Sequence, residues 1–204
     1  MDKIAKILDN GKKLNVIKRV AEQTIGPAET QHAWQDARGI LADMLARHPQ
    51  LSPKQQRHTD LIFPHIAVYK ALAAAHPEAA MGIMGRGEAE TAKQVGETLQ
   101  KLVRLPFGKT LFMKAFAAGC KSGFGAQAGF ANTVHTATAA EYRMDMTACP
   151  YATYCAAEGV PELTRVFCDN DVYAYGNLEG ISFSRTQTLG TGGTKCNFWL
   201  KREK

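Results

Sequence analysis

The sequence lacks the short motifs that mark the commonest metal and redox sites. None of its five cysteines stands in a CxxC pair, and none of its six histidines forms an HxxxH or HxH pair. The first absence excludes the spacing of a zinc ribbon or a thioredoxin-like redox site. The second argues against a zinc hydrolase. From these patterns we expect no bound cofactor and no metal.

Long apolar segments are also missing. No run approaches the roughly 20 apolar residues that a membrane helix needs. The opening segment MDKIAKILDN has charges scattered through it and no apolar core or small-residue cleavage site, unlike a signal peptide. We therefore expect a cytoplasmic protein with no membrane partner. In such a chain an odd number of cysteines argues against a disulfide framework, so the thiols are expected to be reduced.

The positive charge is not concentrated in one place. The net charge is +6, yet lysines and arginines are dispersed along the chain. A nucleic-acid binder collects them in one stripe, so a solvated basic surface is the better interpretation and no nucleic-acid partner is expected. Such a surface would help to attract an anionic small molecule.

The order of the patterns predicts an α+β fold. Helical spacing and prolines indicate helices over 29–47, from Pro53 with an interruption at Pro64, over 77–104, and in a short piece from Pro106. Residues 119–129 hold four glycines, typical of a loop or a closely approached strand, and 133–147 alternate like one half-buried strand. Helices from Pro150 and Pro161 and a hairpin over 181–201 follow.

We expect one domain over residues 1–204, with a mainly helical part over 1–118 and an α+β part over 119–204 that carries the site. The helical N-terminal half should pack on a small antiparallel sheet completed by the C-terminal β-hairpin. Four of the five cysteines fall in the last third of the chain.

Cys149 is placed where a strand is expected to meet a helix. Pro150 suits the first helical position and Gly159 suits the stop, so Cys149 should lie at the N-cap. Unpaired N–H groups there favour a thiolate, which predicts a lowered pKa and a nucleophile or metal ligand. The alternative is a small buried cysteine at a helix start, and Cys155 is better explained by packing.

Two further segments contribute candidate polar groups. Cys168 and Asp171 are three residues apart and can share a helix face as an acid/base pair or metal ligands, whereas Asp169 lies off that face. Arg185 alternates with apolar residues and should point inward, toward one of these carboxylates or toward a substrate carboxylate. Cys196 shares the buried face of the returning strand.

His135 lies alone among the histidines near this half of the chain. It is a candidate base or substrate-binding residue, although a histidine on a strand face is more often structural.

Several short runs between residues 149 and 198 occur in the same order as in a known family. They are Cys149-Pro150-Tyr151, Pro161-Glu162-Leu163, Phe167-Cys168-Asp169-Asn170-Asp171, Phe183-Ser184-Arg185-Thr186, Thr188-Leu189, Gly192-Gly193 and Cys196-Asn197-Phe198. Together they resemble the L-2-amino-thiazoline-4-carboxylic acid hydrolase family, over about 50 residues. A weaker echo lies at Gly123-Phe124-Gly125, and the helical half carries no motif that matches.

The resemblance implies hydrolytic opening of a 2-aminothiazoline-4-carboxylate ring, or of a related C–S or C–N bond, in a small molecule that bears a carboxylate. For that reaction Cys149 is the candidate nucleophile, Asp171 or Asp169 the acid/base and Arg185 the carboxylate binder, with Cys168, Cys196 and His135 as further site residues. The product would be N-carbamoyl-cysteine.

Two alternatives remain open from the sequence. The glycine-containing hairpin that closes on Cys196-Asn197-Phe198 also resembles the end of 4-vinyl reductase domains. This similarity implies a small-molecule- or zinc-binding module without catalysis, in which Cys149, Cys168 and Cys196 gather around the ligand. The third hypothesis is an interaction protein whose helical half binds a partner, for which no heptad pattern is present. The oligomeric state cannot be read from the sequence.

Overall fold

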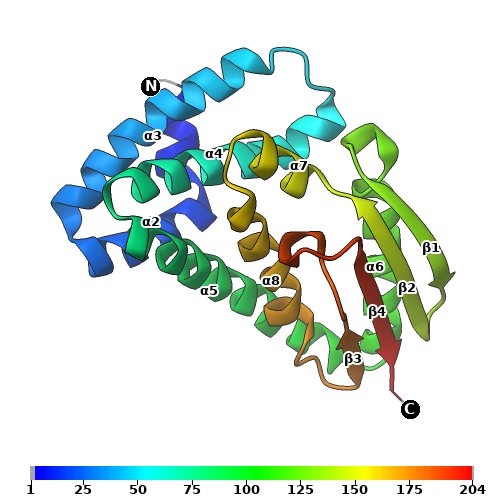
Figure 1. Ribbon diagram of the computed structural model, residues 1–204. Helices are drawn as coiled ribbons and strands as arrows, with labels where there is room; N and C mark the ends of the chain where they lie inside the picture. Colours follow the sequence, from blue (N-terminus) through cyan, green and yellow to red (C-terminus); the bar gives the residue numbers. More distant parts are fainter. Residues whose placement is uncertain (1–2, 204) are drawn as a thin grey trace.

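The computed structural model describes residues 3–203, and in this range six α-helices come before the first strand and two more lie between the second and third strands. The helices are α1 (Lys3–Asn10), α2 (Lys12–Ile25), α3 (Pro27–Arg47), α4 (Pro53–Ala75), α5 (Pro77–Val103), α6 (Gly108–Gly123), α7 (Pro150–Ala157) and α8 (Thr164–Tyr175). The strands are β1 (Ala131–Ala137), β2 (Glu141–Ala148), β3 (Ile181–Ser184) and β4 (Cys196–Arg202). The α+β class is confirmed (Figure 1).

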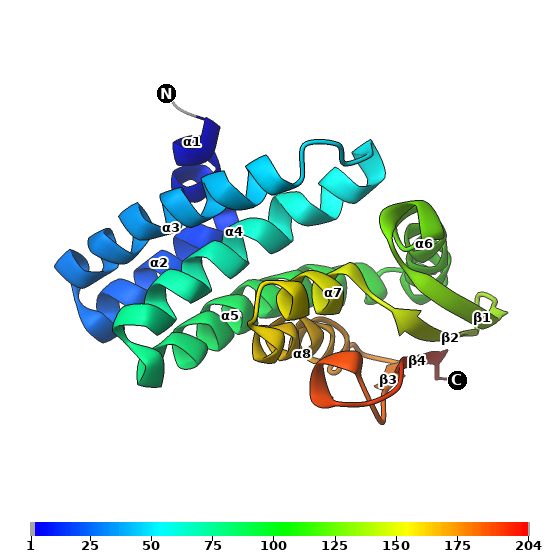
Figure 2. The same ribbon diagram turned by 45° about the horizontal axis from the view of Figure 1, so that its top comes forward.

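Helices α2 to α5 form a bundle around an apolar core (Figure 2). The expected helices over 29–47 and 77–104 are confirmed as α3 and α5. Helix α4 begins with a capping box, in which the Ser52 hydroxyl accepts from the Gln55 backbone N–H and the Gln55 side chain accepts from the Ser52 N–H. Among residues 3–203 no helix is both long and apolar enough to cross a membrane.

The expected interruption at Pro64 is wrong, because α4 continues through this residue. Phe63, Ile66 and Leu72 are completely buried around it. Burial of several such side chains at roughly 1.5–3 kcal/mol each outweighs the ~3 kcal/mol cost of an internal proline. The next residue, His65, donates from Nδ1 to the Leu61 carbonyl at 2.7 Å, which gives a backbone acceptor beside the disturbed turn an additional partner.

Gly87 lies where α5 packs directly against Ile17 of α2. A Cβ at this position would lie 2.6 Å from Ile17 Cγ1 and 2.9 Å from the Ile17 Cα. Ile17 is completely buried, so its backbone has little room to move. A small residue is therefore required where the two helices touch.

We expect Gly87→Ala to lower the free energy of unfolding by about 1–3 kcal/mol, the usual cost of overpacking. Gly85→Ala is the matched control, since nothing lies within 4 Å of its added Cβ. That change should raise the same quantity by up to about 1 kcal/mol through helix propensity. Urea unfolding of both variants measures the difference, and equal effects would refute the packing argument.

The four strands form one sheet in the order β1-β2-β4-β3, with each neighbouring pair antiparallel. Residues 133–147 form two strands rather than the single strand expected, because a tight turn follows Ala137. The Thr138 N–H donates to the Glu141 carbonyl at 2.8 Å and the Glu141 N–H donates to the Thr138 hydroxyl at 2.9 Å. The expected alternation is confirmed, since Tyr142, Met144 and Met146 are buried on one face.

The C-terminal hairpin is confirmed as the pairing of β3 with β4, but its first strand ends at Ser184 instead of Leu189. The Asn197 side chain accepts hydrogen bonds from the backbone N–H groups of Thr186 and Gln187, which draws the chain out of the sheet. A 3-10 turn, Leu189–Thr191, follows. The connection thereby reaches α8 before it returns as β4.

Residues 119–123 are helical, so the expected loop or strand over 119–129 begins only after α6 ends at Gly123. Helices α6 and α8 contact the buried face of the sheet (Figure 1). A helical core and a sheet core result, and Tyr151 packs against both. The predicted division of the single domain at residue 118 stays a prediction, and α6 crosses that position.

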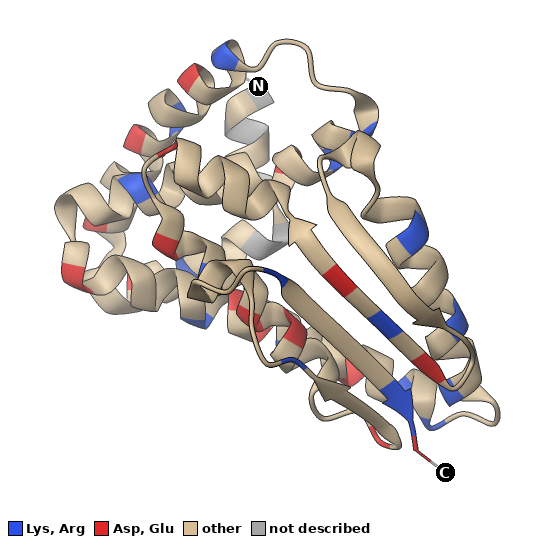
Figure 3. Cartoon of the chain, turned by 45° about the vertical axis from the view of Figure 1, so that its right-hand side comes forward, with Lys and Arg blue, Asp and Glu red and all other residues tan. Residues whose placement is uncertain are grey.

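The outer face of the sheet carries charged and aromatic side chains. Arg143 lies over the Trp199 ring at 5.9 Å, and the Trp199 indole donates to Glu141 at 2.7 Å. Figure 3 shows basic and acidic residues interspersed along β2 and over the helices. The view agrees with the dispersed charge that the sequence indicates.

Candidate active site

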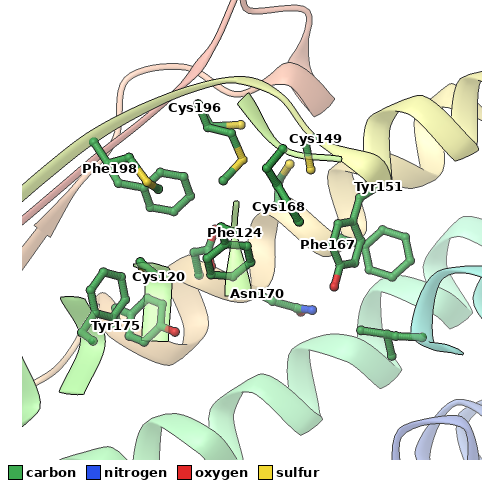
Figure 4. Close-up of a pocket in the computed structure, with 16 residues that line it drawn as sticks. Cys120, Phe124, Cys149, Tyr151, Phe167, Cys168, Asn170, Tyr175, Cys196 and Phe198 are labelled. Carbon is green, nitrogen blue, oxygen red and sulfur yellow. The ribbon is translucent and has the colours of Figure 1, made fainter. Parts of the chain in front are cut away.

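A cavity of about 220 Å³ lies where α6, α7 and α8 meet the buried face of β2 and β4 (Figure 4). Its wall is mostly aromatic and apolar, with thiols and a few polar groups. The lining residues are Leu61, Phe116, Cys120, Phe124, Phe130, Met144, Met146, Cys149, Tyr151, Phe167, Cys168, Asn170, Asp171, Tyr175, Cys196 and Phe198. Small-molecule sites commonly combine such walls with a few convergent polar groups.

The structure brings four of the seven residues expected at the site into this wall: Cys149, Cys168, Asp171 and Cys196. They come from the start of α7, from α8 and from the start of β4. Cys155 is completely buried in the helical core, in agreement with a packing role. Cys120 lines the cavity as well, so the convergence of four thiols and one carboxylate is its central feature.

Cys168 is the thiol that its surroundings stabilise as a thiolate. The Cys196 thiol donates to its sulfur, and so do the Thr188 hydroxyl and the Gly190 backbone N–H. These hydrogen bonds, with the Cys196 thiol first, and the positive charge of Arg185 lower the pKa of Cys168 to about 6, against the opposing effect of burial. The same hydrogen bond, followed by burial, raises the pKa of Cys196.

Gly190 is the residue that lets the connection between β3 and β4 reach this sulfur. A Cβ on Gly190 would lie 2.9 Å from the Cys168 Sγ and 3.0 Å from the Arg165 backbone nitrogen. The absence of a side chain therefore allows its N–H to approach Sγ. The glycine-rich segment serves the thiolate as well as the turn.

Cys149 occupies the expected N-cap of α7, where its side chain makes no capping hydrogen bond, although the backbone N–H groups of Tyr151 and Ala152 lie near its sulfur. The expected lowered pKa is nevertheless wrong. Burial raises the pKa of Cys149 to about 11, and the two N–H groups offset only part of that effect. Near neutral pH this thiol keeps its proton.

Asp171 lies one helical turn after Cys168, and Arg185 binds it from the opposite side. Arg185 Nη1 donates to Asp171 Oδ2 at 3.0 Å and to the Cys168 carbonyl at 2.9 Å. Arg185 therefore points inward and pairs with Asp171, as one of the sequence alternatives had it. Burial raises the pKa of Asp171 to about 7, since desolvation and the neighbouring Cys168 exceed the opposing effect of Arg185.

Arg185 itself is not part of the cavity wall. Its side chain is 8% exposed and its guanidinium lies over the Phe183 and Phe198 rings at 5.9 and 6.0 Å. The ion pair and these ring contacts hold the arginine behind Asp171. This position suits a residue that tunes the carboxyl group and the thiolate.

Besides Arg185, two more of the expected site residues lie away from the cavity wall. Asp169 is 40% exposed and meets Arg165 at 3.4 Å on the surface of α8. His135 is 41% exposed on β1 and contacts Asp145 at 3.1 Å. Asp169 points to solvent because it is one position after Cys168 on α8 and therefore lies on a different face of the helix. His135 points to solvent because it lies on the outer face of β1.

The sequence did not predict a buried hydrogen-bonded group of His65, Glu88 and Asn170, of which Asn170 lines the cavity. His65 Nε2 meets Glu88 Oε1 at 2.8 Å with both side chains 1% exposed, and the Asn170 amide donates to Glu88 Oε2. The three residues come from α4, α5 and α8. Asn170 was in a recognised run, but no local pattern connects His65 with Glu88, 23 positions later.

The zinc alternative requires three ligands around one point. Among residues 3–203 no group of three or more His, Cys, Asp or Glu side chains is arranged to hold a metal ion. Cys149, Cys168 and Cys196 share a cavity wall without forming such a group.

Comparisons with known proteins give one result. No curated protein and no solved structure matches the chain. The sequence model of the family described as L-2-amino-thiazoline-4-carboxylic acid hydrolase matches residues 55–200, well over half of the chain and every residue of the cavity wall. The chain therefore belongs to the L-2-amino-thiazoline-4-carboxylic acid hydrolase family.

Proposed function

We propose that this protein hydrolyses a 2-aminothiazoline-4-carboxylate ring to N-carbamoyl-cysteine, with the Cys168 thiolate as nucleophile. The observation that carries the proposal is the placement of Cys168 and Asp171, one helical turn apart, in the wall of one small cavity, with Arg185 hydrogen-bonded to both residues. These surroundings lower the pKa of the thiol and raise the pKa of the carboxyl group. The family is named for this hydrolysis, which supports the choice of substrate. A cavity of about 220 Å³ suits a single substituted five-membered ring.

The first step uses the electrophilic ring carbon between nitrogen and sulfur. The Cys168 sulfur forms a bond to this carbon, and the bond from the carbon to the ring sulfur breaks. Asp171 donates its proton to the departing sulfur, which avoids release of a free thiolate. The substrate is then attached to Cys168 through an isothiourea carbon, with its own thiol free.

The second step releases the product. Water adds to the isothiourea carbon and gives a proton to the Asp171 carboxylate. The bond to the Cys168 sulfur then breaks, which restores the thiolate and leaves a urea carbon on the cysteine nitrogen. One water is consumed, no ammonia is released, and the product is N-carbamoyl-cysteine.

Arg185 is assigned a positioning role in this proposal, in place of the expected binding of the substrate carboxylate. It holds Asp171 at 3.0 Å and its charge favours the Cys168 thiolate. Cys149 contributes a neutral thiol to the wall, because its pKa is raised.

The direct test is a turnover assay with 2-aminothiazoline-4-carboxylate. The expected result is one free thiol and one N-carbamoyl-cysteine for each ring opened, measured by thiol titration and mass spectrometry. Turnover that releases ammonia, or tight binding without any turnover, would contradict the proposed reaction.

The pH dependence follows from the two groups that react. Activity requires Cys168 without its proton, hence pH above about 6, and Asp171 with its proton, hence pH below about 7. We expect a narrow bell-shaped profile of kcat/KM with a maximum between these values. The groups interact, so both limbs belong to the pair. A profile that keeps rising through pH 8 would contradict the assignment of Asp171 as the acid.

A further inference from the structure

The amide of Asn170 has only one orientation that satisfies the hydrogen bonding of the buried pair formed by His65 and Glu88. His65 Nδ1 faces the Leu61 carbonyl at 2.7 Å, and since a carbonyl only accepts, Nδ1 carries a proton. His65 Nε2 faces Glu88 Oε1 at 2.8 Å, so one proton lies between this nitrogen and this oxygen. The second carboxylate oxygen of Glu88 accepts from the Asn170 amide.

This arrangement requires Asn170 to turn its NH₂ group toward Glu88, as the structure has it. The amide oxygen then points elsewhere. Figure 4 shows Asn170 with its nitrogen directed away from the sulfur atoms of Cys168 and Cys196. The buried pair of His65 and Glu88, both 1% exposed, thus fixes which end of the amide is left for another partner.

Within the described residues, the oxygen end of the Asn170 amide has no hydrogen-bond partner. Asn170 Oδ1 is buried and accepts no hydrogen bond within the described chain, although Asn170 belongs to the cavity wall. A buried acceptor without a donor is costly, and proteins rarely keep one without a use. The unmet requirement is for an N–H or O–H donor supplied from the cavity.

The rest of the cavity wall favours the same kind of ligand. Its polar groups include the Cys168 thiolate and the Asp171 carboxyl, and the lining residues contain no lysine, arginine or histidine. Such a wall suits a ligand portion that is rich in N–H donors and carries positive charge. An isothiourea or amidine group has both properties.

We infer that Asn170 is a specificity-determining residue that accepts a hydrogen bond from the exocyclic amino group of the ring, and that Glu88 and His65 are positioning residues that orient it. The inference rests on the proposed function for the identity of the ring. It adds that the site distinguishes 2-amino rings from rings without that group.

The test compares two aromatic analogues that resist hydrolysis, 2-aminothiazole-4-carboxylate and thiazole-4-carboxylate, which differ only in the amino group. Calorimetric titration of the unmodified protein should give a dissociation constant at least about tenfold lower for the amino compound, the value of one hydrogen bond to a buried partner. Equal dissociation constants, or no binding of either compound, would overturn the inference without the need for any variant.

Variants then assign the preference to Asn170. In Asn170→Leu the two analogues should bind equally, whereas Asn177→Leu, an exposed asparagine after the same helix, should keep the tenfold preference. Retention of the preference in Asn170→Leu would overturn the inference. Thermal unfolding shows whether each variant is folded.

Glu88 offers a sharper pair of variants. In Glu88→Gln the new amide nitrogen can donate to His65 Nε2 while its oxygen still accepts from Asn170, so the preference should survive. In Glu88→Leu nothing orients Asn170, and the preference should fall to about threefold or less. Loss in both variants or retention in both would contradict the positioning role.

Failure of this inference can be told apart from failure of the proposed function. Preferential binding through Asn170 without turnover of 2-aminothiazoline-4-carboxylate would reject the reaction and leave the recognition in place. Turnover combined with equal binding of the analogues would reject the recognition and leave the reaction.

Discussion

Replacement of Cys168 by serine is expected to lower kcat/KM for 2-aminothiazoline-4-carboxylate by at least about 10³-fold, the scale found when a covalent nucleophile is removed. A serine hydroxyl at this position stays protonated, because the hydrogen bonds that stabilise a thiolate cannot ionise an alcohol near neutral pH. The substitution changes one atom and keeps the side-chain shape, so the protein should remain folded. Initial rates and a thermal unfolding curve measure the two quantities.

Cys149→Ser is the matched control for this prediction. Both thiols line the same cavity, but burial holds the pKa of Cys149 at about 11. We expect this variant to keep kcat/KM within about tenfold of the unmodified enzyme, since only packing and one weak hydrogen-bonding group change. The opposite ranking of the two variants would return the role of nucleophile to Cys149.

Arg185→Met is expected to lower both stability and activity. It removes the hydrogen bonds of Arg185 to Asp171 and to the Cys168 carbonyl, which should cost about 1.5–3 kcal/mol of the free energy of unfolding. The pKa of Cys168 should rise, because Arg185 helps to lower it, so the acid limb of the pH profile should move to higher pH. The pKa of Asp171 should rise as well, since Arg185 opposes its upward shift. The whole bell should therefore shift upward in pH.

Arg165→Met is the control that removes a positive charge from α8, the helix that carries Cys168 and Asp171, without removing a contact to Asp171. Arg165 meets Asp169 at 3.4 Å with 70% of its side chain exposed, so its ion pair is worth at most about 1 kcal/mol. Neither limb of the pH profile should move in this variant. Equal shifts for the two variants would mean that general charge, and not the contact to Asp171, sets the profile.

Local sequence patterns predicted most of the secondary structure and one of the key contacts. Prolines and helical spacing located α3, α5 and α7. Alternation placed Tyr142 on a buried strand face and predicted that the Arg185 side chain points inward. The errors arose where long-range packing outweighs local preference. Pro64 is tolerated inside α4 because its neighbours are buried. Strand β3 ends early because the side chain of Asn197, on β4, accepts hydrogen bonds from the backbone after it.

Local sequence patterns could not predict the pKa values of the thiols. The N-cap position of Cys149 was correct, but the extent of its burial depends on how the helical core and the sheet core meet. The stabilisation of Cys168 depends on Thr188, Gly190 and Cys196, which lie 20 or more residues away and come close only in the fold. The family model also covers α5 and α6, which contain none of the recognised runs.

The central claim is that Cys168 bonds covalently to the ring carbon, and trapping that bond tests it most directly. The enzyme is mixed with 2-aminothiazoline-4-carboxylate, quenched with acid within one turnover and digested for mass spectrometry. We expect the peptide that contains Cys168 to gain the mass of the whole substrate, because ring opening loses no atoms, and we expect no such gain in Cys168→Ser. A gain of that mass on the peptide that contains Cys149, or its persistence in Cys168→Ser, would contradict the account.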